Sequence, residues 1–171
     1  AMCDDSDAII INGGTTTFQM VHYLTRRHLQ AFTNSLPIAH HLLDHTQNTV
    51  IVPGGRIYRD QNIILSPFKN DGSKHFQAQQ MFMGAYGIGA MGVLEIDNLI
   101  VQAEEKLIDQ AEEIIVLVDS SKFDIRTSLV LCPLMRISTL VTDTGLSSQA
   151  RDMVQEAGVK LVTVEAPQDP N

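Results

Sequence analysis

Short apolar runs alternate with amphipathic stretches along the whole chain, and this alternation limits the fold more than any other feature of the sequence. The runs lie between turn-forming residues, as buried strands do, and occupy residues 8–11, 29–33, 49–52, 81–85, 114–118, 139–142 and 159–164. Helix-like stretches occupy 15–27, the residues after Pro37, 97–113 and 147–157. The alternation predicts right-handed crossovers and a mainly parallel sheet flanked by helices, a Rossmann-like α/β fold.

The ends of several elements carry further signals. Pro37 suits the first turn of a helix with Ser35 or Asn34 as its N-cap, and Gly158 stands where a C-terminal cap glycine belongs. Residues 56–74 are less regular, and the apolar run 63–65 predicts an edge hairpin or a lid. Neither a repeat nor a change in composition marks a boundary, so we expect a single domain over residues 1–171.

Charge and hydropathy narrow the classes of partner. The formal net charge is −8, with 12 Lys and Arg against 20 Asp and Glu, whereas nucleic-acid-binding domains carry clustered cations. We therefore expect this chain to bind DNA poorly by itself. No apolar run approaches the roughly 20 residues that span a bilayer, and the acidic start at Asp4 and Asp5 is unlike a signal peptide. The sequence predicts a cytoplasmic protein without a membrane partner.

Ligands of parallel sheets bind beyond the carboxyl ends of the strands, so the residues that follow the predicted strands form the candidate site. These loops are rich in small polar residues, and they comprise Asn12-Gly13-Gly14-Thr15-Thr16-Thr17, Thr33-Asn34-Ser35, Pro53-Gly54-Gly55-Arg56, Gly84-Ala85-Tyr86-Gly87 and Asp119-Ser120-Ser121-Lys122. Backbone N–H groups and hydroxyls bind phosphate, while Asn, Asp and Ser bind sugar hydroxyls. The composition of the loops predicts a phosphorylated polyol as ligand.

The phosphate hypothesis depends on residues 13–17. Glycines let the backbone approach an anion, and threonine hydroxyls add donors beside the free N–H groups of a helix N-terminus. The alternative is a tight turn between strand and helix in which Thr15 only caps the helix. The loop matches neither the P-loop pattern nor the dinucleotide fingerprint, which disfavours a nucleotide. We expect no cofactor.

Other charged residues are weaker candidates. Asp119 and Lys122 suit a sugar hydroxyl and a phosphate, but a turn with an Asx cap also explains them. The long predicted helix carries further charges, for which a solvated face is the simpler explanation: Glu104, Glu105 and Lys106. His41 and His45 have the i, i+4 spacing of metal ligands, but no acidic or cysteine partner completes the set. We expect no metal.

Together these loops resemble the effector-binding domain of the DeoR family of bacterial sugar-metabolism repressors. The matching segments occur in the family's order: Ile-Asn-Gly-Gly-Thr-Thr-Thr at 11–17, Phe-Thr-Asn-Ser-Leu-Pro at 32–37, Val-Pro-Gly-Gly-Arg at 52–56, Val-Asp-Ser-Ser-Lys-Phe at 118–123 and Val-Thr-Asp at 141–143. The similarity runs from about residue 7 to residue 165. Segments 34–39, 64–67 and 103–106 are most similar to the members that repress L-ascorbate utilisation.

The resemblance implies the fold of ribose-phosphate isomerase, glucosamine-phosphate deaminase and CoA-transferase, with a pocket for a phosphorylated sugar or sugar acid. The residues in the family's ligand-contacting loops are Gly13, Gly14, Thr15, Thr16, Asn34, Gly54, Gly55 and Lys122. The resemblance also implies an N-terminal helix-turn-helix domain, absent from this chain, that binds operator DNA. It further implies a homodimer or homotetramer that the effector loosens or re-forms, and it implies a regulator and not an enzyme.

Two departures from the family pattern bear on function. Many relatives have an acidic residue at the position of Asn12. They commonly have Gly-Ala-Asp-Gly where this chain has Gly84-Ala85-Tyr86-Gly87, so Tyr86 replaces an aspartate. In enzymes with this fold an aspartate in that region performs acid–base chemistry, for which a phenol with a pKa of about 10 is a poor substitute. The alternative function, a phosphosugar isomerase or deaminase, requires Glu104, Glu105 or Asp119 as its base. A purely structural interaction domain has no use for loops so rich in hydroxyls and glycine.

Overall fold

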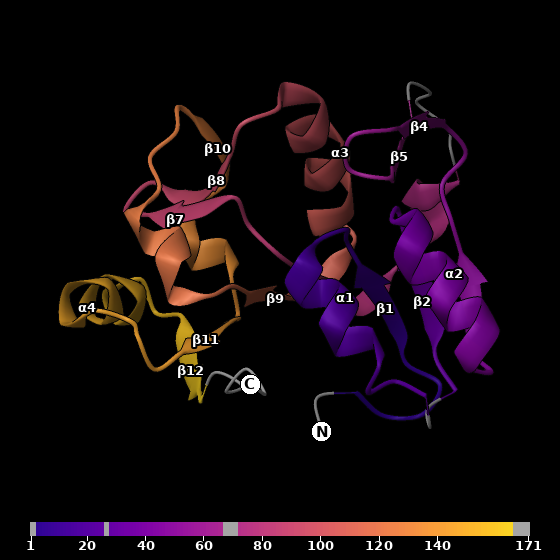
Figure 1. The fold of residues 1–171 in the computed structure, drawn as a ribbon, viewed down its shortest axis with the longest axis horizontal. Coiled ribbons are helices and arrows are strands. Elements are labelled where there is room, and N and C mark those ends of the chain that lie inside the picture. Colours follow the sequence, from indigo (N-terminus) through magenta and orange to yellow (C-terminus); the bar gives the residue numbers. More distant parts are fainter. Residues whose placement is uncertain (1–2, 26–27, 67–71, 166–171) are drawn as a thin grey trace, which may run out of the picture.

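A parallel sheet forms the centre of the molecule in the computed structural model, which describes residues 3–25, 28–66 and 72–165. The sheet has seven strands in the order β12-β11-β9-β6-β1-β2-β3 (Figure 1), and all neighbours run parallel. The strands are β1 (Ala8–Ile11), β2 (Gln30–Thr33), β3 (Thr49–Ile51), β6 (Ala78–Met83), β9 (Ala111–Leu117), β11 (Thr139–Asp143) and β12 (Lys160–Val164). The predicted Rossmann-like fold class is confirmed.

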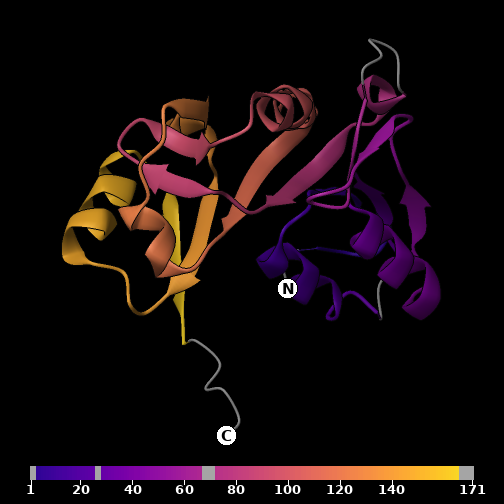
Figure 2. The same cartoon turned by 45° about the horizontal axis from the view of Figure 1, so that its top comes forward.

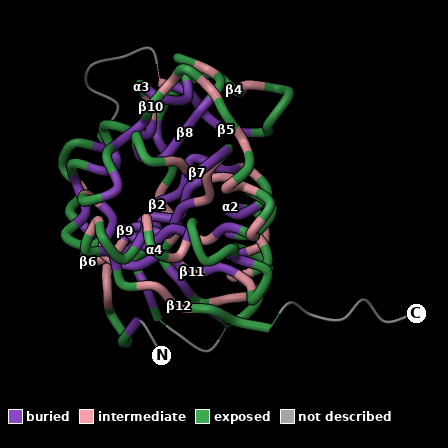
Figure 3. The backbone as a smooth tube through the Cα atoms, turned by 90° about the vertical axis from the view of Figure 1, so that its left-hand side faces the viewer, coloured by how far each residue is buried: buried purple, intermediate pink, exposed green. Residues whose placement is uncertain are grey.

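Helices cover both faces of this sheet. Side chains alternate along β1, so Ile9 and Ile11 pack under α1 (Thr15–Val21) and α2 (Leu36–His45), while Ile10 faces the opposite core. That second core includes α3 (Asn98–Ile108) and α4 (Ser148–Glu156). Figure 2 shows the two groups of helices apart, and Figure 3 shows the buried strands between exposed helical surfaces. Strands buried on both faces explain why the apolar runs are continuous.

Both predicted caps are found in the structure, but two of the predicted helices end earlier in the chain than expected. The Ser35 hydroxyl accepts a hydrogen bond from the Ile38 N–H at 3.4 Å, and Gly158 adopts a φ of +78° after α4. The helix predicted over 15–27 ends at Val21. The helix predicted over 97–113 ends at Ile108, because Ala111 already pairs with Ala78 in the sheet.

A small antiparallel sheet was missed by the sequence analysis. It has the order β10-β8-β7, with β7 (Gly87–Gly89), β8 (Gly92–Glu95) and β10 (Leu129–Cys132). Gly92 has a φ of +134°, and a Cβ there would lie 2.0 Å from the Cys132 carbonyl oxygen. The glycines of this stretch therefore allow a tight turn and close contact between strands. Because glycine has no side chain, the alternation of apolar and polar residues that marks an ordinary hairpin is missing from the sequence.

The predicted hairpin in residues 56–74 is confirmed as β4 (Arg56–Tyr58) paired with β5 (Ile63–Leu65). Backbone hydrogen bonds join it to the loop after β2, from Ile64 N–H to the Asn34 carbonyl at 2.7 Å. The Tyr58 hydroxyl donates to Asp97 at 2.9 Å, and Asp97 caps α3. The hairpin is thus attached to two elements of the main fold, while residues 67–71 of the predicted lid lie outside the described residues.

Candidate ligand-binding site

A hollow of about 190 Å³ lies at the carboxyl ends of β1, β6 and β9. The chain order of the strands reverses between β1 and β6, which is where ligands bind in open parallel sheets. The hollow is lined by Asn12, Gly13, Gly14, Thr15, Thr16, Gln61, Gly84, Ala85, Tyr86, Glu95, Ile100, Glu104, Leu117, Val118 and Lys122. Three separate loops of the predicted site therefore meet in one place.

The loop from Gly13 to Thr16 forms an exposed wall of the hollow. The Gly13 N–H donates to the Asn34 side-chain oxygen at 3.2 Å, which joins this loop to the one after β2. A Cβ on Gly13 would lie 2.7 Å from Ile63 of the hairpin, so glycine permits this close approach. Gly14 is the N-cap residue of α1 and no side chain caps that helix, so capping does not account for Thr15. The Thr15 and Thr16 side chains are exposed at the hollow.

Lys122 enters the hollow from a short 3-10 helix, η2 (Ser120–Asp124), directly after β9. Asp143 at the end of β11 accepts the Ser120 N–H at 2.7 Å, and hydrogen bonds from Ser120 hold the pKa of Asp143 below its usual value. The segment 141–143, which contains Asp143, therefore positions η2. The Lys122 ammonium lies 5.9 Å from the centre of the Tyr86 ring.

Asn12 connects three elements at the floor of the hollow. Its side chain is 2% exposed, and its amide oxygen accepts the Gly84 N–H at 3.2 Å. The amide NH₂ donates to Oε1 of Glu104 on α3. Because the Gly84 N–H can only donate, it fixes the orientation of the Asn12 amide and directs the NH₂ group at Glu104.

The floor also holds two buried carboxyl groups. Glu104 is 6% exposed, and burial, together with the negative charge of Glu95, raises the pKa of Glu104 to about 8, against the opposing hydrogen bond from Asn12. Burial also raises the pKa of Glu95, although N–H groups of Ile96 and Tyr86 and the charge of Lys122 oppose the increase. The solvated-face explanation is wrong for Glu104, whereas Glu105 and Lys106 are exposed.

Several predicted site residues stabilise the loops from beneath the hollow. Thr17 is buried and its hydroxyl donates to the carbonyls of Asn12 at 2.9 Å and Gly14 at 3.0 Å. Thr33 is buried and accepts the Ser35 N–H at 3.1 Å. Their side chains, like that of Ser35, satisfy backbone groups.

Other predicted site residues lie outside this hollow. Arg56 and Lys106 line a second hollow between the hairpin and the outer side of α3. Asn34 and Lys106 also border a small cavity beneath β5. A Cβ on Gly55 would lie 2.5 Å from the Leu65 carbonyl, and one on Gly87 would lie 3.0 Å from Ile125, so both glycines allow close packing. Gly54 is exposed, and Asp119 accepts the Ser121 N–H at 3.0 Å as the predicted Asx cap.

The sequence analysis missed Glu95 and Gln61. Glu95 lies on β8 of the small antiparallel sheet, whereas the predicted candidates lie in loops after parallel strands or on predicted helices. A single carboxylate inside the apolar run 93–96 was an available signal, since buried carboxylates require a specific partner or role. Gln61 lies in the turn of the hairpin, and nothing in its neighbourhood in the sequence marks it.

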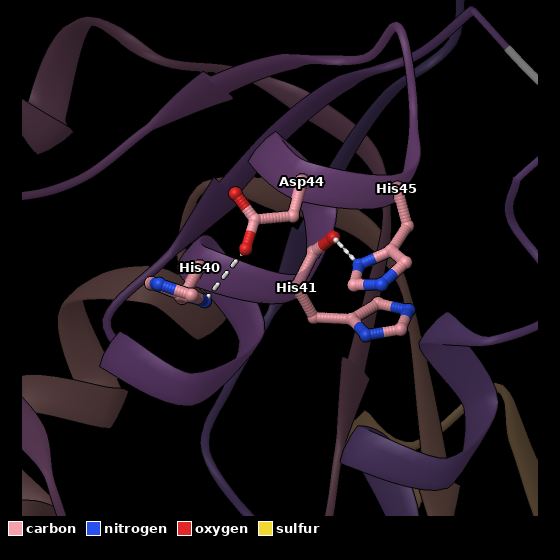
Figure 4. Close-up of polar contacts among 4 residues, drawn as sticks. All are labelled: His40, His41, Asp44 and His45. Carbon is pink, nitrogen blue, oxygen red and sulfur yellow. Dashed lines mark hydrogen bonds and ion pairs between the residues drawn. The ribbon is translucent and has the colours of Figure 1, made fainter.

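The histidines at i, i+4 lie elsewhere, on α2 (Figure 4), where the His41 ring also lies 5.8 Å from the ring of Phe18 of α1. The His41 and His45 rings stack with centroids 4.4 Å apart, and His22 of the loop after α1 contacts His41 at 4.3 Å. Within residues 3–25, 28–66 and 72–165, no group of three or more His, Cys, Asp or Glu is arranged to hold a metal ion. Across the same residues, no helix is both long enough and apolar enough to cross a membrane.

Comparisons with known proteins give one family and one fold. A sequence profile of the DeoR C-terminal sensor domain matches residues 1–144. The regulators named HTH-type transcriptional regulator UlaR of Shigella dysenteriae serotype 1 and of Escherichia coli O1:K1 are each 29% identical over 163 residues. These cover 95% of this chain, which spans 64% of the length of each relative.

Among solved structures, translation initiation factor eIF-2B of Pyrococcus horikoshii OT3 matches with a TM-score of 0.50 and 15% identity. The match covers 81% of this chain and 57% of that one. At this identity the likeness concerns the fold alone, and it agrees with the parallel sheet described above.

Proposed function

Because the chain belongs to the DeoR C-terminal sensor domain family, we propose that it is the ligand-sensing part of a bacterial transcriptional repressor of sugar metabolism. Its ligand is a phosphorylated sugar or sugar acid, bound in the hollow at the ends of β1, β6 and β9. One observation carries the proposal: the donor-rich loop 13–16 and the Lys122 ammonium line the same hollow.

The phosphate is placed between that loop and Lys122. Backbone N–H groups and the hydroxyls of Thr15 and Thr16 supply neutral donors there, and Lys122 supplies the positive charge. The sugar hydroxyls extend toward the floor, where Asn12 and the two glutamates provide hydrogen-bonding groups. Pockets of this kind combine a few convergent polar groups with buried apolar walls, here Ile100 and Val118.

Operator DNA is bound through a helix-turn-helix domain outside this chain. The relatives are named for such a domain, and this chain spans 64% of their length. The net charge of −8 agrees with a protein in which the helix-turn-helix domain contacts DNA and this part does not. We place the regulator in the cytoplasm as a homodimer or homotetramer, and light scattering with and without ligand measures that assembly.

A thermal-shift screen tests the pocket. The probes are phosphorylated sugars and sugar acids, including L-ascorbate 6-phosphate, each beside its unphosphorylated counterpart. A ligand at about 100 times its Kd stabilises the folded state by roughly 2.7 kcal/mol. We expect shifts that require the phosphate and that Thr15→Ala or Lys122→Ala removes. Lys106→Ala is the matched control, because this exposed lysine lies outside the hollow. If no phosphosugar shifts the melting temperature, the proposal is wrong.

An aldose–ketose isomerase or deaminase is the second candidate function. The observation that favours it is Glu104, a pocket carboxyl whose burial raises its pKa to about 8, in the range of a general base at neutral pH. Against it, the relatives are named transcriptional regulators. Assays of aldose–ketose interconversion separate the two functions: turnover that Glu104→Gln abolishes would overturn the regulator proposal.

A further inference from the structure

The floor of the hollow contains more negative charge than its surroundings neutralise. Glu95 and Glu104 are 9% and 6% exposed and reach the hollow from β8 and α3. Among the described lining residues, Lys122 is the cation, and its charge acts on Glu95. Glu104 faces the Asn12 amide and the Glu95 carboxylate. Two buried carboxylates side by side cannot both stay ionised cheaply, because each has lost water and repels the other.

Other titratable groups around α3 do not supply the missing charge. The Cys132 thiol on β10 is neutral, because burial raises its pKa to about 11. Arg136 donates to the backbone carbonyls of Ile108 and Ala111 at 2.7 and 2.9 Å. Asp97 adds a further negative charge near Glu95 and accepts the hydrogen bond of Tyr58. The other Lys and Arg side chains on or near α3 are exposed: Arg56, Lys74 and Lys106.

The hydrogen bonds decide which oxygen of Glu104 carries a proton. The Gly84 N–H fixes the Asn12 amide, and the amide NH₂ donates to Oε1 of Glu104. Oε1 is therefore an acceptor, and a proton on Glu104 resides on Oε2. Asn12 therefore sets the orientation of the Glu104 carboxyl.

We propose that Glu104 is protonated in the unliganded pocket and donates a hydrogen bond to an acceptor oxygen on the unphosphorylated end of the ligand. This inference rests on the proposed phosphosugar pocket, and it names the ligand class more closely. The distal end of the ligand carries a carboxylate, enolate or carbonyl oxygen. A buried carboxylic acid that stays neutral at pH 7 is suited to donate to such an oxygen. Binding of an anionic end is therefore coupled to the proton on Glu104.

The first test needs no ligand. Infrared difference spectra of the wild-type protein against Glu104→Gln report the C=O stretch of a protonated carboxyl. We expect that band at pH 7 and its loss as pH rises through about 8, the pKa of Glu104. Glu105→Gln is the matched control, since Glu105 is the exposed neighbour on the same helix and its removal leaves the band unchanged. Absence of the band at pH 6.5 overturns the inference.

The second test compares two probes that differ at one carbon, D-gluconate 6-phosphate and D-glucitol 6-phosphate. Both carry the same phosphate, so the ratio of their Kd values isolates the carboxylate. We expect the affinity for the gluconate to fall about tenfold per pH unit above the pKa of Glu104, relative to the glucitol. Glu104→Gln keeps a donor without a titrating proton, so in this variant the ratio of the two Kd values should no longer change with pH.

The outcomes separate the inference from the proposed function. Binding of both probes with a ratio that does not change with pH overturns the proton-coupled donor and leaves the phosphosugar pocket standing. If neither probe binds at any pH and no other phosphosugar of the thermal-shift screen binds, the proposed phosphosugar pocket is wrong, and the inference that Glu104 donates to a ligand is wrong with it, whatever the infrared band shows.

Discussion

Two clusters of like-charged titratable side chains lie in this molecule in different surroundings. The first is the buried pair Glu95 and Glu104 at the floor of the hollow. The second is a histidine cluster formed by His22, which follows α1, and by His41 and His45 of α2, the two of which Figure 4 draws. His41 is half-buried, and the other two histidines are exposed. Burial raises the pKa of Glu104 to about 8. Burial and the charges of His22 and His45 lower the pKa of His41, and the charge of Asp44 opposes this decrease.

The difference shows that access to water matters more than the number of like charges. The histidine cluster has more members and ring centroids within 4.4 Å, yet water reaches its outer rings and screens their charge. The two glutamate side chains are less than a tenth exposed at the floor of the hollow, so a charge there has lost most of its water and costs far more. The two clusters also respond to pH in opposite directions, because one is acidic and the other basic.

Replacing Glu104 should have the largest effect on this comparison. Its folded-state pKa is raised, so its contribution to stability is complete below pH 4.5 and is lost as pH rises through about 8. We expect Glu104→Gln to stabilise the protein by as much as about 5 kcal/mol at pH 9 relative to its effect at pH 4, at about 1.4 kcal/mol per pKa unit. Urea unfolding of both proteins at the two pH values measures this, with Glu105→Gln as control. An equal effect at both pH values would show that the floor is hydrated.

Removing the amide of Asn12 should have the next largest effect. Asn12→Ala deletes the donor to Glu104 and the acceptor of the Gly84 N–H, both at a site that is 2% exposed. We expect a loss of about 2–3 kcal/mol in the free energy of unfolding at pH 7, because a buried N–H is left without a partner. Thr16→Ala on the exposed wall is the control and should stay within about 0.5 kcal/mol. A loss below about 0.5 kcal/mol for Asn12→Ala would mean that water replaces the amide.

The sequence predicted the wall of the hollow better than its floor. Strand ends meet at one sheet edge by topology alone, so residues 13–16 and Lys122 could be placed together from the alternation of strands and helices. Glu104 was a candidate, but its burial depends on the rotation of α3 about its axis. That rotation is set by packing of Ile100, Ile63 and Leu65, which are distant in sequence.

Arg56 and Lys106 show a second reason why the site could not be predicted fully from the sequence. Both belong to segments that match the family, 52–56 and 103–106, yet the β4–β5 hairpin and the outer face of α3 place them at a separate hollow. Glu95 shows a third, because the antiparallel strand that bears it begins at a glycine with positive φ and has no alternating pattern. In each case the missing information is how a local element docks on the sheet, which the order of elements does not contain.

A smaller effect should come from the centre of the histidine cluster. The pKa of His41 is lowered, so its contribution to stability is present above pH 6.5 and is lost as pH falls through its folded-state pKa. We expect His41→Phe to be neutral at pH 8 and to stabilise the protein at pH 5 by less than about 1 kcal/mol, because water screens a half-exposed ring. Melting temperatures at the two pH values measure this. A gain at pH 5 as large as that of Glu104→Gln at pH 9 would contradict the comparison.

The smallest effect should come from His40, one turn from Asp44 on the solvent side of α2. Their side chains are 81% and 52% exposed and lie 3.1 Å apart (Figure 4). Exposed pairs at i, i+4 contribute about 0.3–0.5 kcal/mol, because solvent screens the charges and ordering two side chains costs entropy. We expect His40→Ala to change the free energy of unfolding, measured by urea unfolding, by no more than about 0.5 kcal/mol. A larger loss would mean that exposed charges on this surface interact as strongly as buried ones, so the contrast with the glutamate pair would no longer rest on burial.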